Sequence, residues 1–328
     1  MEASIIVMAY NRRKYLLNAL NSAIKQNIER SRYEILLIKN FAEEVIDEFC
    51  ISHGIHTIKT ENVSIGEYIL TAVNNSSGDI LFFLDDDDAF AENKLEVVLE
   101  SYKAHPDIVY LRNSWSLIDS EGKHIDQKRK KRQPLSHQTL QILSTEEAVK
   151  RIGLDFRWNM SCISVKKEIF NGFESFLPSL IAAQDLALFY MAASYNKVLA
   201  GCNASLTFYR VHENSMTKIK GPNNDALREY NSLLPLENLL SPGFLKEDLN
   251  KTLDKLYFLS IWDGSSIKKS QAKKVLGDYL SHEMYNFYDI KVLIFIFFQY
   301  ILISLGGANT IKKMRQIIDP FWSYEENF

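Results

Sequence analysis

Four consecutive aspartates, Asp85 to Asp88, are the residues in this chain that point most directly to chemistry. They follow the apolar run Ile80 to Leu84, which predicts a buried strand. Neighbouring carboxylates repel one another unless a cation lies among them, and Asp85 and Asp87 point the same way in an extended segment. Because Mg²⁺ and Mn²⁺ prefer hard oxygen ligands, the run predicts a divalent-cation site at the carboxyl end of a strand. A loop of solvated or helix-capping aspartates is the alternative.

A fifth carboxylate, Asp185, lies in the run Leu180 to Ala193, which is otherwise almost wholly apolar apart from Gln184. An isolated charge in such a segment is costly unless it is partnered or functional. A carboxylate within hydrogen-bond reach of a substrate hydroxyl can accept its proton, so Asp185 is the candidate general base. The alternative role is to cap the helix that begins there.

Short apolar runs recur along the first part of the chain and predict the strands that must position these carboxylates. The predicted strands are Ser4 to Ala9, Glu34 to Ile38, Ile80 to Leu84, Ile108 to Leu111 and Leu206 to Arg210. Helical patterns separate them, and strands that alternate with helices are typical of an α/β sheet covered on both faces.

Polar residues mark where some of the intervening helices begin. Ser64 with Glu67, and Ser144 with Glu147, have the spacing of a capping box. Asn11 is predicted to cap an earlier helix, because asparagine accepts hydrogen bonds from the first free N–H groups of a helix. The apolar face of that helix consists of Leu16, Leu20, Ala23 and Ile24.

The composition excludes several classes of protein. The 328 residues include 38 Lys and Arg and 41 Asp and Glu, and the net charge of −3 gives no support to general nucleic-acid binding. Cys50, Cys162 and Cys202 are too far apart to predict a disulfide framework or a zinc site, which fits a reducing compartment. No basic and apolar leader begins at Met1, so we expect a cytoplasmic protein.

The segment Val292 to Leu305 is apolar on all sides and leads into Gly306 and Gly307. Its 14 residues span about 21 Å as a helix, against about 30 Å for a bilayer core. Three interpretations stay open: a segment that dips into a membrane, a tilted span, and a buried helix. The basic run Lys128 to Arg132 is either a solvated face or a contact for anionic lipids. Together these features allow peripheral contact with the cytoplasmic face of a membrane.

The chain is expected to divide near residue 220. Prolines 222, 235 and 242 punctuate the sequence there, and the later residues have a helical pattern. We therefore predict a catalytic α/β domain over residues 1–220. Residues 221–328 are predicted to form a helical extension that carries the apolar segment 292–307.

Four stretches of the sequence together resemble one family. SIIVMAYNRRKYL (residues 4–16) and GDILFFLDDDDAF (residues 78–90) resemble the family 2 glycosyltransferases of the GT-A fold, whose DXD motif matches Asp85 to Asp87. QDL (residues 184–186) and YRVHENS (residues 209–215) match later segments of that family in the same order. The resemblance covers about residues 3–217. It implies a Rossmann-like, mostly parallel sheet with helices on both faces, with the helical extension after it.

The resemblance also implies roles for individual residues in a reaction that uses a nucleotide-diphosphate sugar. Asp87 and His212 would hold Mn²⁺ or Mg²⁺, which neutralises the departing diphosphate, and Asp85 and Asp86 would help orient the ribose or a metal-bound water. Asp185 would be the base of a direct displacement that inverts the anomeric centre.

Further residues are implied to contact the two substrates. On the nucleotide side they are Ala9, Tyr10, Asn11 and Asn40, with Tyr10 stacking on the base. On the acceptor side they are Arg157, Trp158 and Gln184, and the acceptor would be a glycan, a polysaccharide or a lipid-linked sugar. Three features depart from the family. Leu70 and Thr71 stand where a basic residue often faces the diphosphate. Asn40 stands where an aspartate often contacts the base, and Gln184 stands where a glutamate often precedes the base aspartate.

Three other functions remain as alternatives. A phosphatase of the haloacid dehalogenase type also places a DxD motif after a strand, with the first aspartate as nucleophile, but it expects Thr or Val where this chain has Ala89. A sugar nucleotidyltransferase would need a glycine-rich phosphate loop, and Ala9 to Arg13 contain no glycine. A catalytically silent module that binds nucleotide sugars is the third, and the presence of all the carboxylates disfavours it.

Overall fold

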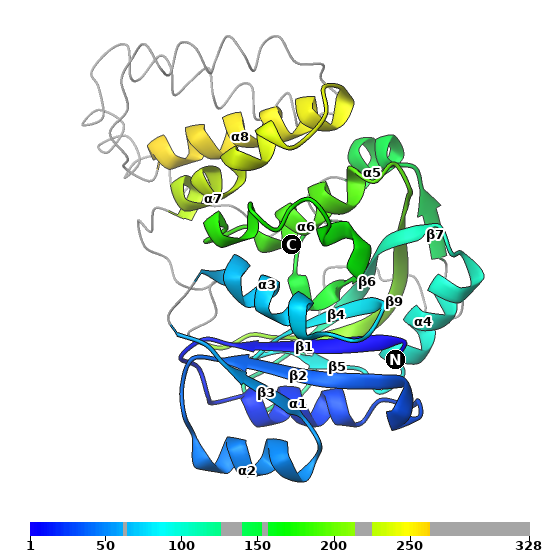
Figure 1. The fold of residues 1–328 in the computed structure, drawn as a ribbon, viewed down its shortest axis with the longest axis vertical. Helices are drawn as coiled ribbons and strands as arrows, with labels where there is room; N and C mark the ends of the chain where they lie inside the picture. Colours follow the sequence, from blue (N-terminus) through cyan, green and yellow to red (C-terminus); the bar gives the residue numbers. More distant parts are fainter. Residues whose placement is uncertain (62–63, 126–139, 153–156, 214–224, 263–328) are drawn as a thin grey trace. The chain divides into compact units, whose positions relative to one another are not determined.

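The computed structural model describes residues 1–61, 64–125, 140–152, 157–213 and 225–262. The chain divides into two compact units. Figure 1 shows the described helices and strands coloured along the sequence. The first unit comprises residues 1–148, 156–180 and 184–219, and the second comprises residues 149–155, 181–183 and 220–328.

The described part of the first unit contains one sheet of nine strands. They are β1 (Ala3–Ala9), β2 (Tyr33–Lys39), β3 (His56–Lys59), β4 (Ile80–Asp85), β5 (Ala89–Phe90), β6 (Ile108–Ile118), β7 (Leu140–Leu143), β8 (Ile163–Lys166) and β9 (Val198–Arg210). Their order is β3-β2-β1-β4-β8-β6-β9-β5, and β7 also pairs with β9. Neighbours from β3 to β4 are parallel, as are β6 and β9, whereas β8 is antiparallel to both β4 and β6. Strands β1 to β4, β6 and β9 therefore run in one direction, which confirms the predicted mostly parallel α/β sheet.

Helices cover both faces of this sheet, as predicted. They are α1 (Leu16–Ile24), α2 (Glu44–Ser52), α3 (Ile65–Asn75), α4 (Lys94–Ala104), α5 (Thr145–Ile152) and α6 (Gln184–Ala193). Short 3₁₀ turns complete the unit at η1 (Arg30–Arg32), η3 (Met160–Cys162), η4 (Lys167–Phe170) and η5 (Leu177–Ser179). Figure 1 shows α1 and α2 on one side of the sheet and α3 and α6 on the other.

Strand β1 illustrates why the sequence forms these layers. All seven of its residues are buried, and alternate side chains point to opposite faces. Ile5 and Val7 pack in the same core as Leu20 of α1 and Val98 of α4, and Ile6 is fully buried on the opposite face. A strand covered on both faces can be apolar throughout, and this explains its unbroken apolar run.

The second unit is described by itself through the helices α7 (Asp225–Leu233) and α8 (Phe244–Trp262) and the turn η6 (Leu234–Asn238). The rings of Tyr230 and Tyr257 join α7 to α8 with centroids 5.4 Å apart. The hydroxyl of Ser232 accepts hydrogen bonds from the backbone N–H groups of Ile181 and Ala182 at 3.1 and 3.0 Å. These contacts tie a short segment from the middle of the chain to its later helices.

Both predicted capping boxes are confirmed. The Glu67 N–H donates to Oγ of Ser64 at 3.1 Å, and the Ser64 N–H donates to Oε2 of Glu67 at 2.8 Å. Ser144 and Glu147 exchange the same pair of bonds at the start of α5. The match is close because a capping box is a local interaction that four neighbouring residues specify.

The predicted cap at Asn11 is wrong. Helix α1 begins at Leu16, and its cap position is Tyr15, which makes no side-chain cap hydrogen bond. Asn11 has a positive φ of 56° and instead bonds to Asn40. Two predicted strands are also too short, because β6 continues to Ile118 and β9 begins at Val198. The polar residues in those extensions interrupt the apolar pattern.

The apolar segment 292–307 and the basic run 128–132 lie outside the described residues. Within the described ranges, no helix has both the length and the hydropathy to cross a bilayer.

Candidate active site

The predicted site residues gather at one edge of the sheet of the first unit. Strands β1, β2, β4 and β9 run in one direction, so their carboxyl ends meet at the same edge. Asp85 is the last residue of β4, and Arg210 is the last residue of β9. Tyr10 and Asn40 immediately follow β1 and β2. The fold thus assembles, from separate parts of the sequence, the edge at which open α/β sheets bind ligands.

Arg12 holds two of the four aspartates. Its Nη2 lies 2.5 Å from Oδ1 of Asp86, and its Nε donates to Oδ2 of the same carboxylate at 3.2 Å. Its Nη1 donates to Oδ2 of Asp87 at 2.6 Å. The guanidinium therefore places a positive charge against this cluster, where the sequence predicts a divalent cation. Sequence reasoning missed Arg12, because nothing local distinguishes it from Arg13.

His212 and Arg210 approach the cluster from β9 and the residues after it. Nε2 of His212 lies 3.2 Å from Oδ2 of Asp87, the oxygen that Arg12 also contacts. Nε of Arg210 donates to the backbone carbonyl of Asp87 at 2.8 Å. The backbone N–H of Arg210 donates to Oδ1 of Asp88 at 3.0 Å. The predicted proximity of Asp87 and His212 is therefore present, although they are 125 residues apart.

A buried network of hydrogen bonds holds the backbone of Asp85 on the core side of the aspartate run. Oγ of Ser161 accepts the Asp85 N–H at 3.1 Å. The carbonyl of Ser161 accepts a hydrogen bond of 2.6 Å from Nζ of Lys94, which is fully buried and also donates to Oγ1 of Thr207 at 3.0 Å. Thr207 in turn accepts from the amide of Asn113 at 2.9 Å. Asp85 is thus fixed through its backbone by a network that spans β4, β6 and β9.

Burial governs the protonation of these carboxyl groups. Desolvation raises the pKa of Asp86 to about 8, and the Arg12 charge opposes that rise. Desolvation and the charge of Asp87 raise the pKa of Asp85 to about 7. Desolvation also raises the pKa of Asp88. The ionised form of the cluster is therefore costly, and added positive charge would lower these pKa values.

Asp185 lies in the first turn of α6, where two backbone N–H groups hold its carboxylate. The Leu186 N–H donates to Oδ1 at 2.9 Å, and the Asn159 N–H donates to Oδ2 at 3.1 Å. Desolvation raises the pKa of Asp185, and both hydrogen bonds oppose that rise. The negative charge of Asp185 contributes to the raised pKa of Asp85, so the two carboxylates interact. Gln184 is the first residue of α6 and is half-buried.

The predicted nucleotide-side residues form a rim around the ends of β1 and β2. Tyr10 is 48% exposed, and its ring meets that of Tyr68 edge-on with centroids 6.0 Å apart. The Asn11 N–H donates to Oδ1 of Asn40 at 2.9 Å, and Nδ2 of Asn40 donates to Oδ1 of Asn11 at 3.1 Å. Ala9 is fully buried, so its contribution to a site would come from its backbone.

Three aromatic rings from separate elements meet on the acceptor side. Trp158 lies 5.9 Å from Trp115 and 5.4 Å from Tyr209, measured between ring centroids, and Trp115 lies 6.0 Å from Tyr209. All three side chains are half-buried. Of these, only Trp158 was predicted, since nothing in the sequence alone connects the other two. The predicted Arg157 is buried, with Nη1 donating to the hydroxyl of Tyr190 at 3.0 Å and Cζ lying 4.4 Å from the Phe189 ring centroid.

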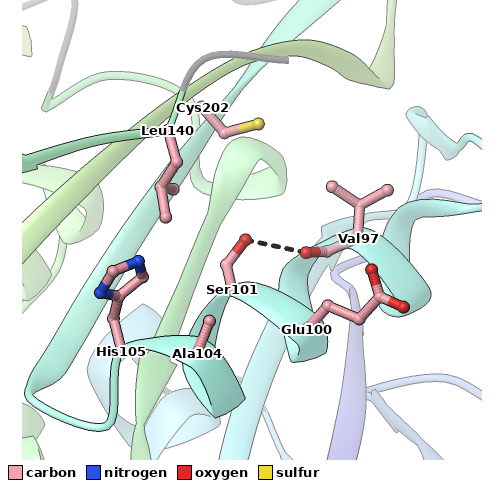
Figure 2. Close-up of a pocket in the computed structure, with 7 residues that line it drawn as sticks. All are labelled: Val97, Glu100, Ser101, Ala104, His105, Leu140 and Cys202. Carbon is pink, nitrogen blue, oxygen red and sulfur yellow. Dashed lines mark hydrogen bonds between the residues drawn. The ribbon is translucent and has the colours of Figure 1, made fainter.

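A separate shallow pocket of about 210 Å³ lies between α4, β7 and β9 (Figure 2). Its lining consists of Val97, Glu100, Ser101, Ala104, His105, Leu140 and Cys202. The Ser101 hydroxyl donates to the carbonyl of Val97, one turn earlier in α4, at 2.8 Å. None of the predicted site residues lines this pocket, so we assign no chemistry to it.

Asp87, Asp88 and His212 are the side chains that could hold the predicted cation. The described ranges contain no group of three or more His, Cys, Asp or Glu side chains that could hold a metal ion. Nε2 of His212 nevertheless lies 3.2 Å from Oδ2 of Asp87, so both side chains could contact one ion. Oδ2 of the buried Asp88 has no hydrogen-bond partner among the described residues. Mg²⁺ is commonly bound by one or two protein carboxylates together with substrate phosphates and waters. The donor set therefore fits a cation that completes its coordination with a diphosphate.

Comparisons with known proteins give this chain a family match and several similar proteins. The family model for glycosyl transferase family 2 matches residues 4–158. An uncharacterized glycosyltransferase of Haemophilus influenzae is 30% identical over 173 residues, which are 51% of this chain and 53% of that protein. Another, from Rickettsia bellii, is 29% identical over 129 residues, which are 38% of this chain and 18% of that protein. The chain thus spans about half, or less, of the length of these curated relatives.

Among solved structures, S. aureus TarS (residues 1–349, in complex with UDP) superimposes with a TM-score of 0.60. The match covers 96% of this chain and 92% of that chain. At 14% sequence identity it shows that the two chains share a fold and nothing more. Residues 4–158 of this chain therefore match the model of glycosyl transferase family 2, and the sheet that contains them has the GT-A fold.

Proposed function

We propose that this protein transfers a sugar from a nucleotide-diphosphate sugar to an acceptor hydroxyl. The observation that carries the proposal is the link between Asp85 and Asp185: the Asn159 N–H donates to Asp185, the Ser161 N–H donates to Oδ1 of Asn159, and the Asp85 N–H donates to Oγ of Ser161. The family match supports the reaction class. Two of the similar TarS structures are complexes with UDP and with UDP-GlcNAc, which supports a nucleotide-sugar donor.

Asp87 and His212 are the residues that would hold a divalent cation against the donor. When bound, Mn²⁺ or Mg²⁺ would stabilise the negative charge that develops on the leaving diphosphate. Asp86 and Asp85 would act from the same edge, on the ribose or on water molecules of the cation. The raised pKa values of both carboxyls support this assignment, because each is costly to ionise without a nearby positive charge.

Asp185 is proposed as the general base. The two backbone N–H groups that hold its oxygens fix the carboxylate in one orientation, which is what proton abstraction at a defined position requires. Its raised pKa makes it a better proton acceptor than an exposed aspartate, as long as it is ionised. Attack of the deprotonated acceptor on the anomeric carbon, opposite to the diphosphate, would invert the configuration.

The nucleotide would be held at the ends of β1 and β2. Tyr10 exposes enough of its ring to stack on a base. Two hydrogen bonds join Asn40 to Asn11, one from the Asn11 backbone N–H and one to the Asn11 side-chain oxygen, so the orientation of the Asn40 amide is fixed. Asn40 can both donate and accept a hydrogen bond, whereas an aspartate in this position would only accept. We therefore leave the identity of the base open among the common nucleoside diphosphates.

A carbohydrate acceptor is proposed on the basis of the aromatic group Trp115, Trp158 and Tyr209. Sugar rings pack well on aromatic faces, since their C–H groups cover apolar surface. Trp158 is next to Asn159, whose N–H binds Asp185, and Tyr209 is next to Arg210, which binds Asp87. The group is therefore linked in sequence to both halves of the site. A glycan or the sugar part of a lipid-linked acceptor would both suit it.

Calorimetric titration with UDP, GDP, dTDP and CMP, each with and without Mn²⁺, tests the proposed function. We expect one nucleoside diphosphate to bind in a metal-dependent way, and Asp87→Ala to abolish the metal dependence. The exposed Asp107→Asn is the matched control and should bind like the wild type. Absence of binding by any of the four nucleotides to the folded wild-type protein would contradict the proposal.

A further inference from the structure

Arg12 bridges two aspartates of the candidate site. Its guanidinium contacts both oxygens of Asp86 and one oxygen of Asp87 over distances of 2.5 to 3.2 Å. This is a fork geometry that arginine makes with carboxylates and phosphates alike. The side chain of Asp86 is 1% exposed and that of Asp87 is 16% exposed, whereas the Arg12 side chain is 44% exposed. Arg12 thus covers the carboxylates from the solvent side.

The segment that carries Arg12 is held in place at Asn11 and belongs to no helix or strand. Asn11, the residue before it, has a φ of 56° and is held by two hydrogen bonds to Asn40. Residues 10–15 lie between β1 and α1 and belong to neither. The backbone therefore directs the Arg12 side chain to the ends of β1 and β4. A long side chain can change partners there without a change in the sheet.

Arg12 and His212 both contact the same carboxylate oxygen, Oδ2 of Asp87. Oδ2 of Asp87 receives Nη1 of Arg12 at 2.6 Å and lies 3.2 Å from Nε2 of His212. A divalent cation on Asp87 would bring two further positive charges to the oxygen that the guanidinium contacts. Arg12 and a cation on Asp87 therefore compete, because each is attracted by the same carboxylate and repelled by the other. A displaced guanidinium needs another anion nearby, and a diphosphate provides one of matching geometry.

We infer that Arg12 is an exchangeable counter-ion: it pairs with Asp87 and contacts Asp86 in the ligand-free protein, and it moves to the donor's diphosphate when a divalent cation takes Asp87. The inference rests on the proposed function, because it requires a diphosphate-containing donor. It gives Arg12 two opposite effects. Arg12 weakens cation binding in the absence of nucleotide and strengthens nucleotide binding in the presence of the cation. Binding of cation and of nucleotide would then be coupled through a single side chain.

The test compares Arg12→Ala with wild type in the full-length chain. Mn²⁺ affinity without nucleotide is measured from the electron paramagnetic resonance signal of free Mn²⁺. Affinities for UDP, GDP and dTDP in the presence of Mn²⁺ are measured by calorimetry. We expect Arg12→Ala to bind Mn²⁺ roughly tenfold more tightly and the nucleoside diphosphate roughly tenfold more weakly. Two shifts of opposite sign are not expected from general damage to the site, which would weaken both.

Arg13→Ala is the matched control. Arg13 is the next residue, is 45% exposed, and pairs at 3.1 Å with Glu43 rather than with the aspartates, so its removal should leave both affinities at the wild-type values. Arg12→Lys keeps the charge without the fork, and smaller shifts in the same directions are expected. This second variant keeps the test informative if thermal unfolding shows that Arg12→Ala is not folded.

The outcomes separate this inference from the proposed function. Unchanged or weaker Mn²⁺ binding by Arg12→Ala would overturn the inference, as would unchanged nucleotide affinity. If wild type and Arg13→Ala both fail to bind UDP, GDP and dTDP, the proposed function fails and the inference falls with it. If all three proteins bind nucleotide equally, the proposed function survives and the inference alone is overturned.

Discussion

The backbone N–H of Asn159 donates a hydrogen bond of 3.1 Å to Oδ2 of Asp185. Asn159 has a φ of 68°, in the left-handed region, and its own Oδ1 accepts the N–H of Ser161 at 2.9 Å. Ser161 in turn binds the backbone of Asp85. The candidate base and the aspartate run are therefore connected through three residues, 159 to 161, and this connection sets their relative position.

Asp185→Asn should separate catalysis from binding. The amide has nearly the shape of the carboxylate but cannot accept the acceptor's proton, so we expect sugar transfer to fall by about 10²-fold or more. Donor affinity, measured by calorimetry, should stay within about twofold. Asp107→Asn, the same change at an exposed position, is the control and should retain full activity. Transfer by Asp185→Asn at the wild-type rate would remove Asp185 from the mechanism.

The buried carboxyl of Asp86 predicts a pH dependence of stability. Its pKa is about 8 in the folded protein and about 3.8 when unfolded, so the folded state binds the proton more tightly. The contribution to the free energy of unfolding is therefore largest below pH 4 and is lost as the pH rises towards 8. Asp85, with a pKa of about 7, acts in the same direction.

Asp86→Asn removes one of these titrations and should flatten the dependence. We expect the melting temperature of the wild type, measured without metal, to fall between about pH 5 and pH 8, and that of Asp86→Asn to fall less. Asp107→Asn, at an exposed position, should follow the wild type. A wild-type melting temperature that rises over this range would contradict the assignment.

Lys94 predicts a stability effect of its own. Its buried Nζ donates to the Ser161 carbonyl and to Oγ1 of Thr207, and it lies 3.7 Å from the Phe90 ring centroid. Lys94→Met keeps the apolar volume but removes the donor to both acceptors. We expect a loss of about 1–3 kcal/mol in the free energy of unfolding, measured with urea. Lys103→Met, on the exposed side of the same helix, should cost less than about 0.5 kcal/mol.

The same lysine makes stability rise at alkaline pH. Desolvation lowers the pKa of Lys94 to about 7, so between pH 7 and about 10 the unfolded chain binds a proton that the folded chain lacks. Its contribution to the free energy of unfolding therefore grows with pH over that range. Lys94→Met should lose this rise, and urea unfolding at about pH 7 and about pH 9 measures the difference. An unchanged rise in the variant would assign it to another group.

The aromatic group predicts a selective effect on the acceptor. Trp158→Ala removes one of the three faces, so we expect the KM for a carbohydrate acceptor to rise about three- to tenfold. Donor affinity and the slow hydrolysis of the donor by water should be unchanged, because neither uses the acceptor surface. Trp158→Phe keeps an aromatic face and should recover much of the loss. Equal losses in donor and acceptor binding would indicate a structural role instead.

Much of the site could be predicted from residues that are close in sequence. The apolar runs of β1 and β4 are buried on both faces, so each strand is evident without its neighbours. The aspartates follow β4 directly, which places them at the end of a strand. Ser64 and Glu67 form their cap within four residues. In each case the determining interactions are local, or depend on the hydrophobicity of a continuous run.

Other features required the tertiary structure. Arg12 and Arg13 are equivalent in the sequence, and only the fold directs Arg12 to Asp86, 74 residues away, and Arg13 to Glu43. The expected cap at Asn11 failed because the long-range bond to Asn40 competes with local capping. Asparagine at this position favours a helix cap when only its neighbours in sequence are considered. The backbone turn between β1 and α1 instead brings Asn11 next to Asn40, at the end of the neighbouring strand β2.

The order of the amino acids was thus enough to predict a mostly parallel α/β sheet, the acidic end of β4 and the resemblance to the family whose model matches residues 4–158. Folding selected the cation that faces those carboxylates, the backbone groups that hold Asp185, and the rings that join Trp158. The difference lies in the range of the interactions. Hydrophobic burial and capping act along a continuous segment, whereas ion pairs and ring contacts depend on which distant strand ends the parallel sheet brings together.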